Sequence, residues 1–184
     1  MPIVRAILPA LLLAVVALSP PTASRAAAAP HLDVERYALR LINCTRTGGW
    51  VRADGSCKGY GSGRHSKYRP PLRLSAGLSG RVARPYAVRI ARNDYCGHGL
   101  NGSTIRKRFR RAGFDGSPYG ENIGCSWGEP VRDAVIRTHR YMQAERSYSG
   151  WHWRNLKDKD FRLVGIGVAK VDGQIRWVTD FYHP

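Results

Sequence analysis

Four cysteines constrain the fold of this chain of 184 residues more than any other feature. They are Cys44, Cys57, Cys96 and Cys125, and an even number of cysteines in an exported chain is typical of disulfides. Four cysteines allow three pairings. We favour Cys44–Cys57, which closes a short loop, and Cys96–Cys125, which joins two segments that carry candidate functional residues. A tetrathiolate metal site is the alternative, but the spacing lacks the paired C-x-x-C pattern of such sites.

Residues 1–29 have the pattern of a secretory signal peptide. Arg5 precedes an apolar run over residues 6–18, and a tract of small residues follows at 26–29. The run is too short to span a bilayer as a helix of the mature protein, and no later run is apolar enough. We therefore expect residues 30–184 to form one secreted, extracellular domain without a transmembrane segment, since about 155 residues suit a single domain.

The chain is strongly basic, with 30 Lys and Arg residues against 13 Asp and Glu residues. Two of the basic residues and none of the acidic ones lie in residues 1–29, so the rest keeps a formal net charge of +15. This excess predicts attraction to a polyanion such as an anionic cell-wall polymer or an anionic lipid, with nucleic acid less favoured. A plain solvated helix face is the alternative interpretation of the densest cluster, which consists of Arg106, Lys107, Arg108, Arg110 and Arg111.

The first half of the domain predicts two helices separated by a loop. Apolar residues recur at helical spacing over residues 31–44, with Asp33 as a plausible N-cap. Residues 45–74 are rich in glycine, basic and without periodicity, so they predict a long surface loop. A second helix is expected from Ser75, with a bend or break near Ala83 because Pro85 removes a backbone hydrogen bond.

The second half predicts two further helices, a strand and a hairpin. Ser103 is the expected cap of a short helix over residues 104–112, and the last helix begins near Pro130, with His139 on its outer face. Residues 119–125 resemble a strand. Residues 163–171 and 174–182 alternate as a hairpin, joined by an Asp-Gly turn of type I′. Because helices and strands do not alternate as βαβ units, the pattern favours an α+β fold with an antiparallel sheet covered by helices.

Several motifs follow one another over residues 33–182. They are Leu41-Ile42-Asn43, Pro71-Leu72-Arg73-Leu74-Ser75, Cys96-Gly97-His98, Gly120-Glu121-Asn122-Ile123, His152-Trp153-Arg154-Asn155-Leu156, and Gly165-Ile166-Gly167-Val168 followed by Trp177 and Asp180-Phe181. In this order they resemble the CAP superfamily of secreted bacterial type. This superfamily comprises cysteine-rich secretory proteins, antigen 5 and pathogenesis-related proteins, and its domain is also called the SCP domain.

The resemblance implies a three-layer α-β-α sandwich with a mainly antiparallel central sheet. It also implies a cleft lined by two histidines and two acids, which in some members binds a divalent metal. Carried over to this chain, the histidines are His98 and His152 and the first acid is Glu121. The second acid follows an aromatic-containing pair near the end of the penultimate helix, and Glu145 is the candidate for it.

The chemistry of these residue types allows two kinds of site. Two imidazoles, His98 and His152, with one or two carboxylates suit Zn²⁺ or another divalent metal, with water in the open position. Without metal, the same groups can act as acid and base, since histidine titrates near neutral pH. Alternatives remain open: Glu121 and Asn122 as hydrogen-bonding loop residues, His98 as a solvated turn residue, Trp151 and Trp153 as either cleft wall or core.

We hold three hypotheses for function. The first is a secreted protein that binds a ligand in or over the cleft, at the cell envelope or in the extracellular medium, without established catalysis. The second is a metal-dependent, peptidase-like hydrolase, and the third is a small basic secreted nuclease. The sequence lacks the H-E-x-x-H pattern, and the expected disulfides leave no spare thiol, so a hydrolase with a cysteine nucleophile is disfavoured. Asn155 is expected to be a structural amide rather than a reactant.

Overall fold

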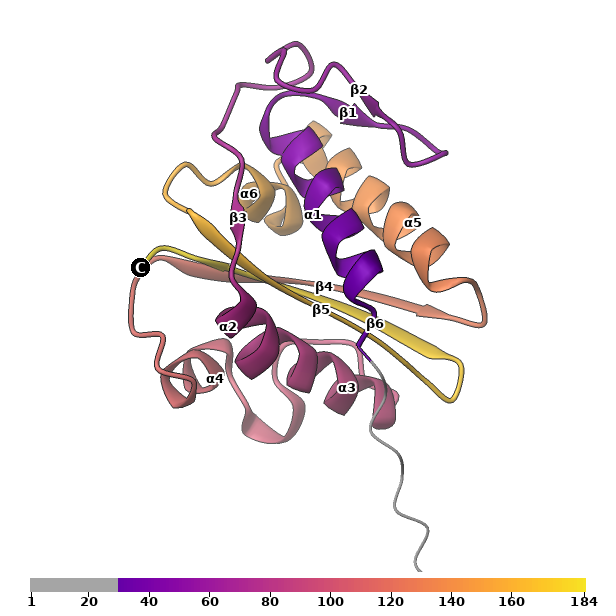
Figure 1. Cartoon of the computed structure of the whole chain (residues 1–184), viewed down its shortest axis with the longest axis vertical. Helices are drawn as coiled ribbons and strands as arrows, with labels where there is room; N and C mark the ends of the chain where they lie inside the picture. The colour runs from indigo at the N-terminus through magenta and orange to yellow at the C-terminus, as the bar shows by residue number, and fades with distance from the viewer. Residues whose placement is uncertain (1–29) are drawn as a thin grey trace, which may run out of the picture.

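The computed structural model describes residues 30–184, and the expected signal peptide lies outside the described residues. Helices cover both faces of a central sheet (Figure 1). One outer layer consists of α1, α5 and α6, and the other consists of α2, α3 and α4. The α+β sandwich of three layers expected from the motifs is confirmed. None of the helices among the described residues has the length and apolar character needed to cross a membrane.

The central sheet has the strand order β3-β5-β6-β4. Its strands are β3 (Arg73–Leu74), β4 (Tyr119–Trp127), β5 (Leu163–Val171) and β6 (Gln174–Tyr182). Only the β3–β5 pair is parallel, so the sheet is mainly antiparallel, as expected. Strands β5 and β6 form the predicted hairpin, and Asp172 and Gly173 have the positive φ angles, 49° and 81°, that a type I′ turn requires.

The first helical layer contains α1 (Leu32–Arg46), α5 (Val131–Ala144) and α6 (Trp151–Lys157), with η3 (Glu145–Tyr148) leading into α6. Helix α1 is amphipathic, and its apolar stripe packs against α5 and β5 because residues such as Leu41 and Ile42 recur on one face. The predicted N-cap is wrong. His31 occupies that position. Asp33 lies in the first helical turn, where its negative charge interacts favourably with the positive end of the helix dipole.

His139 lies on the inner face of α5, so the expectation of an outer-face position is wrong. It is fully buried, and its Nε2 atom lies 2.8 Å from Thr45 Oγ1, which donates to Gln143 Oε1 at 2.9 Å. Burial lowers the pKa of His139 to about 3, so the ring is neutral. The position follows from helical spacing, since His139 lies four residues after the buried Val135 and shares its face.

The second helical layer contains α2 (Ala76–Leu78), a π-helical segment η1 (Ser79–Ala83) and α3 (Arg84–Arg92). Ser75 caps this run as predicted, since its side chain accepts from the Leu78 N–H at 3.2 Å. The break expected near Ala83 is also confirmed: the π-helical segment ends there and α3 begins with Pro85 in its first turn, where a missing N–H is tolerated. This layer packs closely on β5 at Gly167, which has no side chain. A Cβ at that position would lie only 2.4 Å from the Ala83 carbonyl carbon.

The same layer continues through η2 (Leu100–Gly102) into α4 (Ile105–Arg111). The cap of α4 is Thr104, whose side chain accepts from the Lys107 N–H, so the expectation of Ser103 misses by one residue. Gly113, with φ of 76°, follows the C-cap, a position where glycine commonly ends a helix.

The glycine-rich segment 45–74 is fixed to the domain at several points. It contains a small hairpin, β1 (Trp50–Val51) with β2 (Cys57–Lys58), and the Cys44–Cys57 disulfide joins it to α1. Arg46 is fully buried and donates to the carbonyls of Leu156 and Asp158 at 2.9 and 3.0 Å. The segment is therefore irregular in backbone but anchored beside α6.

Candidate functional site

The first His–Glu pair is built on β4. Glu121 lies near the start of this strand with its side chain buried, and its Oε1 atom is 2.7 Å from His98 Nδ1. His98 lies in an irregular turn, which the Cys96–Cys125 disulfide joins to the same strand. Tyr86 of α3 donates to the Gly97 carbonyl at 2.7 Å. The disulfide, which is one of the two pairs favoured from the sequence, and this hydrogen bond position the imidazole beside Glu121.

Arg108 of α4 completes the surroundings of Glu121. It forms an ion pair with Glu121 Oε2 and donates to the carbonyls of His98 and Ser103 at 2.9 and 3.1 Å. Its Cζ atom lies 3.5 Å from the centre of the Tyr86 ring. Arg108 is only 9% exposed and therefore does not belong to an exposed basic cluster, contrary to the sequence expectation. The other four basic residues of that cluster are exposed.

Asp180 is a third carboxyl group in this region that sequence analysis did not identify as a site residue. It lies directly opposite Glu121 in the β4–β6 register and is fully buried. Burial, and then the nearby charge of Glu121, raise the pKa of Asp180 well above its ordinary value. Neither of its oxygens has a hydrogen-bond partner among the described residues when it is ionised. A protonated Asp180 removes this penalty because it can donate to Glu121.

The second His–Glu pair is built from η3 and α6. Glu145 Oε1 lies 2.6 Å from His152 Nδ1. Glu145 Oε2 accepts from the backbone N–H groups of His152 and Trp153 at 2.9 and 3.4 Å. These N–H groups belong to the first turn of α6, and N–H groups in the first turn of a helix have no acceptor within the helix. Glu145 therefore both orients the His152 imidazole and caps the N-terminus of α6.

Two asparagines connect the segments that carry the pairs. Asn155 Nδ2 donates to the Glu121 carbonyl at 3.2 Å and to Asn122 Oδ1 at 2.8 Å. Asn122 Nδ2 in turn donates to the His152 carbonyl at 3.1 Å. The expectation of a structural role for the Asn155 amide is confirmed, because it joins α6 to β4. Gly120 allows helix α6 to approach this closely, because a Cβ at that position would lie only 2.8 Å from Asn155 Oδ1.

The structure does not assemble the four candidate residues into a single ligand cluster. Within residues 30–184, no group of three or more His, Cys, Asp or Glu side chains is arranged to hold a metal ion. Metal binding by His98 and His152 therefore stays a prediction. Trp151 is largely exposed and Trp153 is half-buried, so neither is a core residue.

Comparisons with known proteins give similarity of fold. No protein-family model and no curated protein matches the chain. An outer surface protein from Borrelia burgdorferi superposes with a TM-score of 0.62 at 16% identity, over 85% of this chain and 97% of that one. An extracellular protein containing an SCP domain from Bacillus anthracis gives 0.57 at 18% identity, over 83% of this chain and 41% of that one. NaASP2, solved with Zn²⁺, gives 0.55 at 14% identity, over 83% and 80%. The chain therefore has the fold of the SCP domain, the fold of the CAP superfamily that its motifs resemble.

Proposed function

We propose that this protein acts outside the cytoplasm and binds a ligand at the surface formed by the His98–Glu121 and His152–Glu145 pairs. One observation carries the proposal: in both pairs a buried carboxylate holds the Nδ1 atom of a more exposed imidazole. The side chains of Glu121 and Glu145 are 0% and 7% exposed, whereas those of His98 and His152 are 51% and 29% exposed. Two disulfides support an oxidising compartment.

The pairs have the same chemical consequence for each ring. A carboxylate at Nδ1 favours the tautomer with the proton on that nitrogen, which leaves Nε2 as an acceptor or metal ligand. Two imidazole nitrogens are fewer protein ligands than a typical Zn²⁺ site has, so an ion held by His98 and His152 would carry water at its remaining positions. A bound ion would supply a Lewis acid at the surface between the pairs. Without metal, each ring can exchange a proton with a bound ligand.

A titration of the metal-free protein with Zn²⁺ tests the role of the imidazoles. We expect His98→Ala and His152→Ala each to weaken binding by about tenfold or more, since each removes a ligand atom. The control is His31→Ala, because His31 precedes α1 and bonds to neither pair. Equal Zn²⁺ affinity in all four proteins, or an equal loss in the control, would show that the ion binds elsewhere.

A second candidate function is attraction to an anionic polymer through α4. It is supported by four exposed cations of this helix, which are Arg106, Lys107, Arg110 and Arg111. Among the described residues, none of the four forms an ion pair with an acid. Such attraction releases counterions, so affinity should fall by about 10² between about 50 and 200 mM salt if all four charges engage. Binding to a teichoic-acid-type polymer is compared at two salt concentrations for the parent and for Arg106→Gln/Arg110→Gln.

The matched control for this polymer experiment is Arg36→Gln/Arg40→Gln, which removes the same charge from exposed positions of α1. Helix α1 lies in the opposite layer (Figure 1). We expect weaker binding in the α4 variant and nearly unchanged binding in the α1 variant. Salt-insensitive binding, or an equal loss in both variants, would argue against a localised site on α4.

A further inference from the structure

A cavity of about 380 Å³ lies between α3 and α4. Arg108 lines the cavity and also forms the ion pair with Glu121, which does not itself line it. Its volume falls in the range of about 300–1,000 Å³ typical of small-molecule sites. Neither the His–Glu pairs nor the exposed face of α4 accounts for it.

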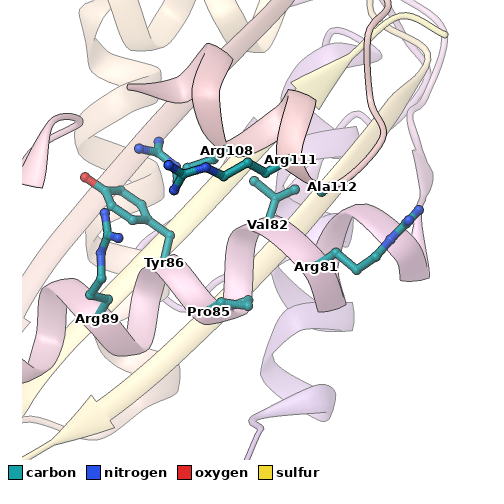
Figure 2. A pocket seen from close by; sticks show the side chains of 8 residues that line it. All are labelled: Arg81, Val82, Pro85, Tyr86, Arg89, Arg108, Arg111 and Ala112. Carbon is teal, nitrogen blue, oxygen red and sulfur yellow. The ribbon is translucent and has the colours of Figure 1, made fainter. Parts of the chain in front are cut away.

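The cavity is lined by four arginines and no acid. Figure 2 shows the side chains of Arg89, Arg108 and Arg111 gathered around the Tyr86 ring, whereas Arg81 extends away at the other end. The Cζ atoms of Arg108 and Arg89 lie 3.5 and 5.3 Å from the centre of this ring. Positive charge is therefore concentrated at one end of the cavity, where Tyr86 holds the guanidinium groups by cation–π contact.

The hydrogen-bonding capacity of these arginines is not used up within the protein. The Nε atoms of Arg89 and Arg108 are buried and have no acceptor among the described residues. Arg108 itself is more than nine-tenths buried. Arg111 is exposed and has no ion pair within the described part of the chain. The exposed Arg111 guanidinium is therefore open to a bound anion, whereas Arg108 and Arg89 add positive charge while their Nη atoms already donate within the protein.

The rest of the cavity wall is apolar. Val82 and Pro85 of the η1–α3 run line one side, and Ala112 at the end of α4 lines the other. In Figure 2 these side chains lie beside the arginine cluster, between it and Arg81. A ligand that fills the cavity therefore needs an anionic group and an adjoining apolar body.

We propose that this cavity binds an organic phosphate, that is, a phosphate group attached to an apolar body. The phosphate lies among Arg89, Arg108 and Arg111, and the apolar body packs on Val82, Pro85 and Ala112. Three guanidinium groups favour phosphate over carboxylate, because a tetrahedral dianion offers acceptors in several directions and a carboxylate offers one planar edge. The same chemistry is present in a soluble phosphate ester and in a phospholipid headgroup.

The proposal is tested by calorimetric titration with phenyl phosphate, inorganic phosphate and phenol. Phenyl phosphate is expected to bind saturably, inorganic phosphate at least about fivefold more weakly, and phenol not measurably up to about 10 mM, because charge and apolar contact are both needed. The decisive variant is Arg89→Gln/Arg111→Gln, which should weaken phenyl phosphate binding by about tenfold or more. Circular dichroism and thermal unfolding check that it folds, and the single variant Arg111→Gln, at an exposed position, serves if the double variant does not.

The matched control is Arg106→Gln/Arg110→Gln, which removes the same charge from residues of α4 that do not line this cavity. It should keep phenyl phosphate affinity within about twofold, although we expect it to lose polymer binding. An equal loss in both double variants, or no saturable phenyl phosphate binding in the parent, would overturn the proposal. This variant therefore separates the two surfaces, although Arg111 belongs to both.

Vesicle sedimentation distinguishes the two sources of phosphate. Phosphatidylcholine vesicles are used with and without phosphatidic acid. If phosphatidic acid promotes binding, and both Arg89→Gln/Arg111→Gln and excess phenyl phosphate abolish it, the ligand is a lipid headgroup. If phenyl phosphate binds and the vesicles do not, the ligand is a soluble organic phosphate.

Discussion

The two His–Glu pairs have nearly the same Nδ1–Oε1 contact, but different groups hold the carboxylate in each pair. The Nδ1–Oε1 distances are 2.7 Å in the first pair and 2.6 Å in the second. Glu121 is held by side chains from other elements, Arg108 of α4 and Asp180 of β6. Glu145 is held by backbone N–H groups of the helix turn that carries its own histidine. The first pair therefore depends on the tertiary fold, and the second is built within one short stretch of the chain.

This difference predicts where free energy of unfolding is concentrated. Around Glu121, two carboxyl groups and one guanidinium are buried together, so removal of one partner leaves a buried group without compensation. Around Glu145, the carboxylate can be replaced by another acceptor without loss of the backbone hydrogen bonds. Substitutions should therefore be more destabilising at the first pair than at the second.

The largest effect is expected for Arg108→Met. The change keeps much of the side-chain volume but leaves Glu121 beside Asp180 without its cation, which should lower the free energy of unfolding by about 3–5 kcal/mol. Urea denaturation at neutral pH measures it. The control is Arg106→Met, an exposed position on the same helix, where a change within about 0.5 kcal/mol is expected. A loss for Arg108→Met no larger than that of the control would show that the cluster carries little stability.

Asp180→Asn should change how stability depends on pH. Because the folded-state pKa of Asp180 is raised, its contribution to stability is fully present below its unfolded pKa and is lost as the pH rises through the folded value. Asparagine keeps a donor to Glu121 at every pH. Between pH 4 and pH 7 the variant should therefore gain about 1–3 kcal/mol relative to the parent, measured as the free energy of unfolding. Parallel pH profiles for the two proteins would contradict a protonated Asp180.

The same contrast explains what could be predicted from the sequence. The fold and the local elements followed from patterns within short segments, such as the Asp172-Gly173 turn and the break before Arg84. His98, Glu121 and His152 were identified because they lie in the motifs that resemble the family, and Glu145 was a candidate from its position near the end of the penultimate helix. Local motifs thus located three members of the two His–Glu pairs, and position along the helix indicated the fourth.

The residues that sequence analysis missed act through contacts between distant segments. Arg108 was grouped with its helical neighbours, and only the packing of α4 onto Glu121 shows that it differs from them. The role of Asp180 depends on the β4–β6 register, although an acid inside a strand of buried residues was a usable signal. The expected outer-face position of His139 is wrong, although its spacing of four residues from the apolar Val135 was a usable signal for the inner face.

A smaller effect is expected for Glu145→Gln. The amide oxygen can still accept from the backbone N–H groups of His152 and Trp153, but the charge-assisted contact with the ring is lost. The free energy of unfolding should fall by about 1–2 kcal/mol, measured by urea denaturation. Glu121→Gln is the matched comparison, and it should be more destabilising because its carboxylate also pairs with Arg108. The contrast between the pairs is wrong if Glu145→Gln is the more harmful of the two.

The smallest effect is expected for His98→Ala. The ring is about half exposed, so its contact with Glu121 resembles a surface interaction, and its loss should cost less than about 1 kcal/mol. Glu121 keeps Arg108 and Asp180 as partners in the variant. His152→Ala should be somewhat more destabilising, because that ring is less exposed and also packs beside Tyr141.

Thermal unfolding in metal-free buffer measures both alanine variants, with His31→Ala as the reference. If His98→Ala proved as destabilising as Arg108→Met, the imidazole would be a structural part of the cluster. If it is nearly neutral in stability yet weakens Zn²⁺ binding, the carboxylate side of the pair maintains the fold and the imidazole side is free to meet a ligand.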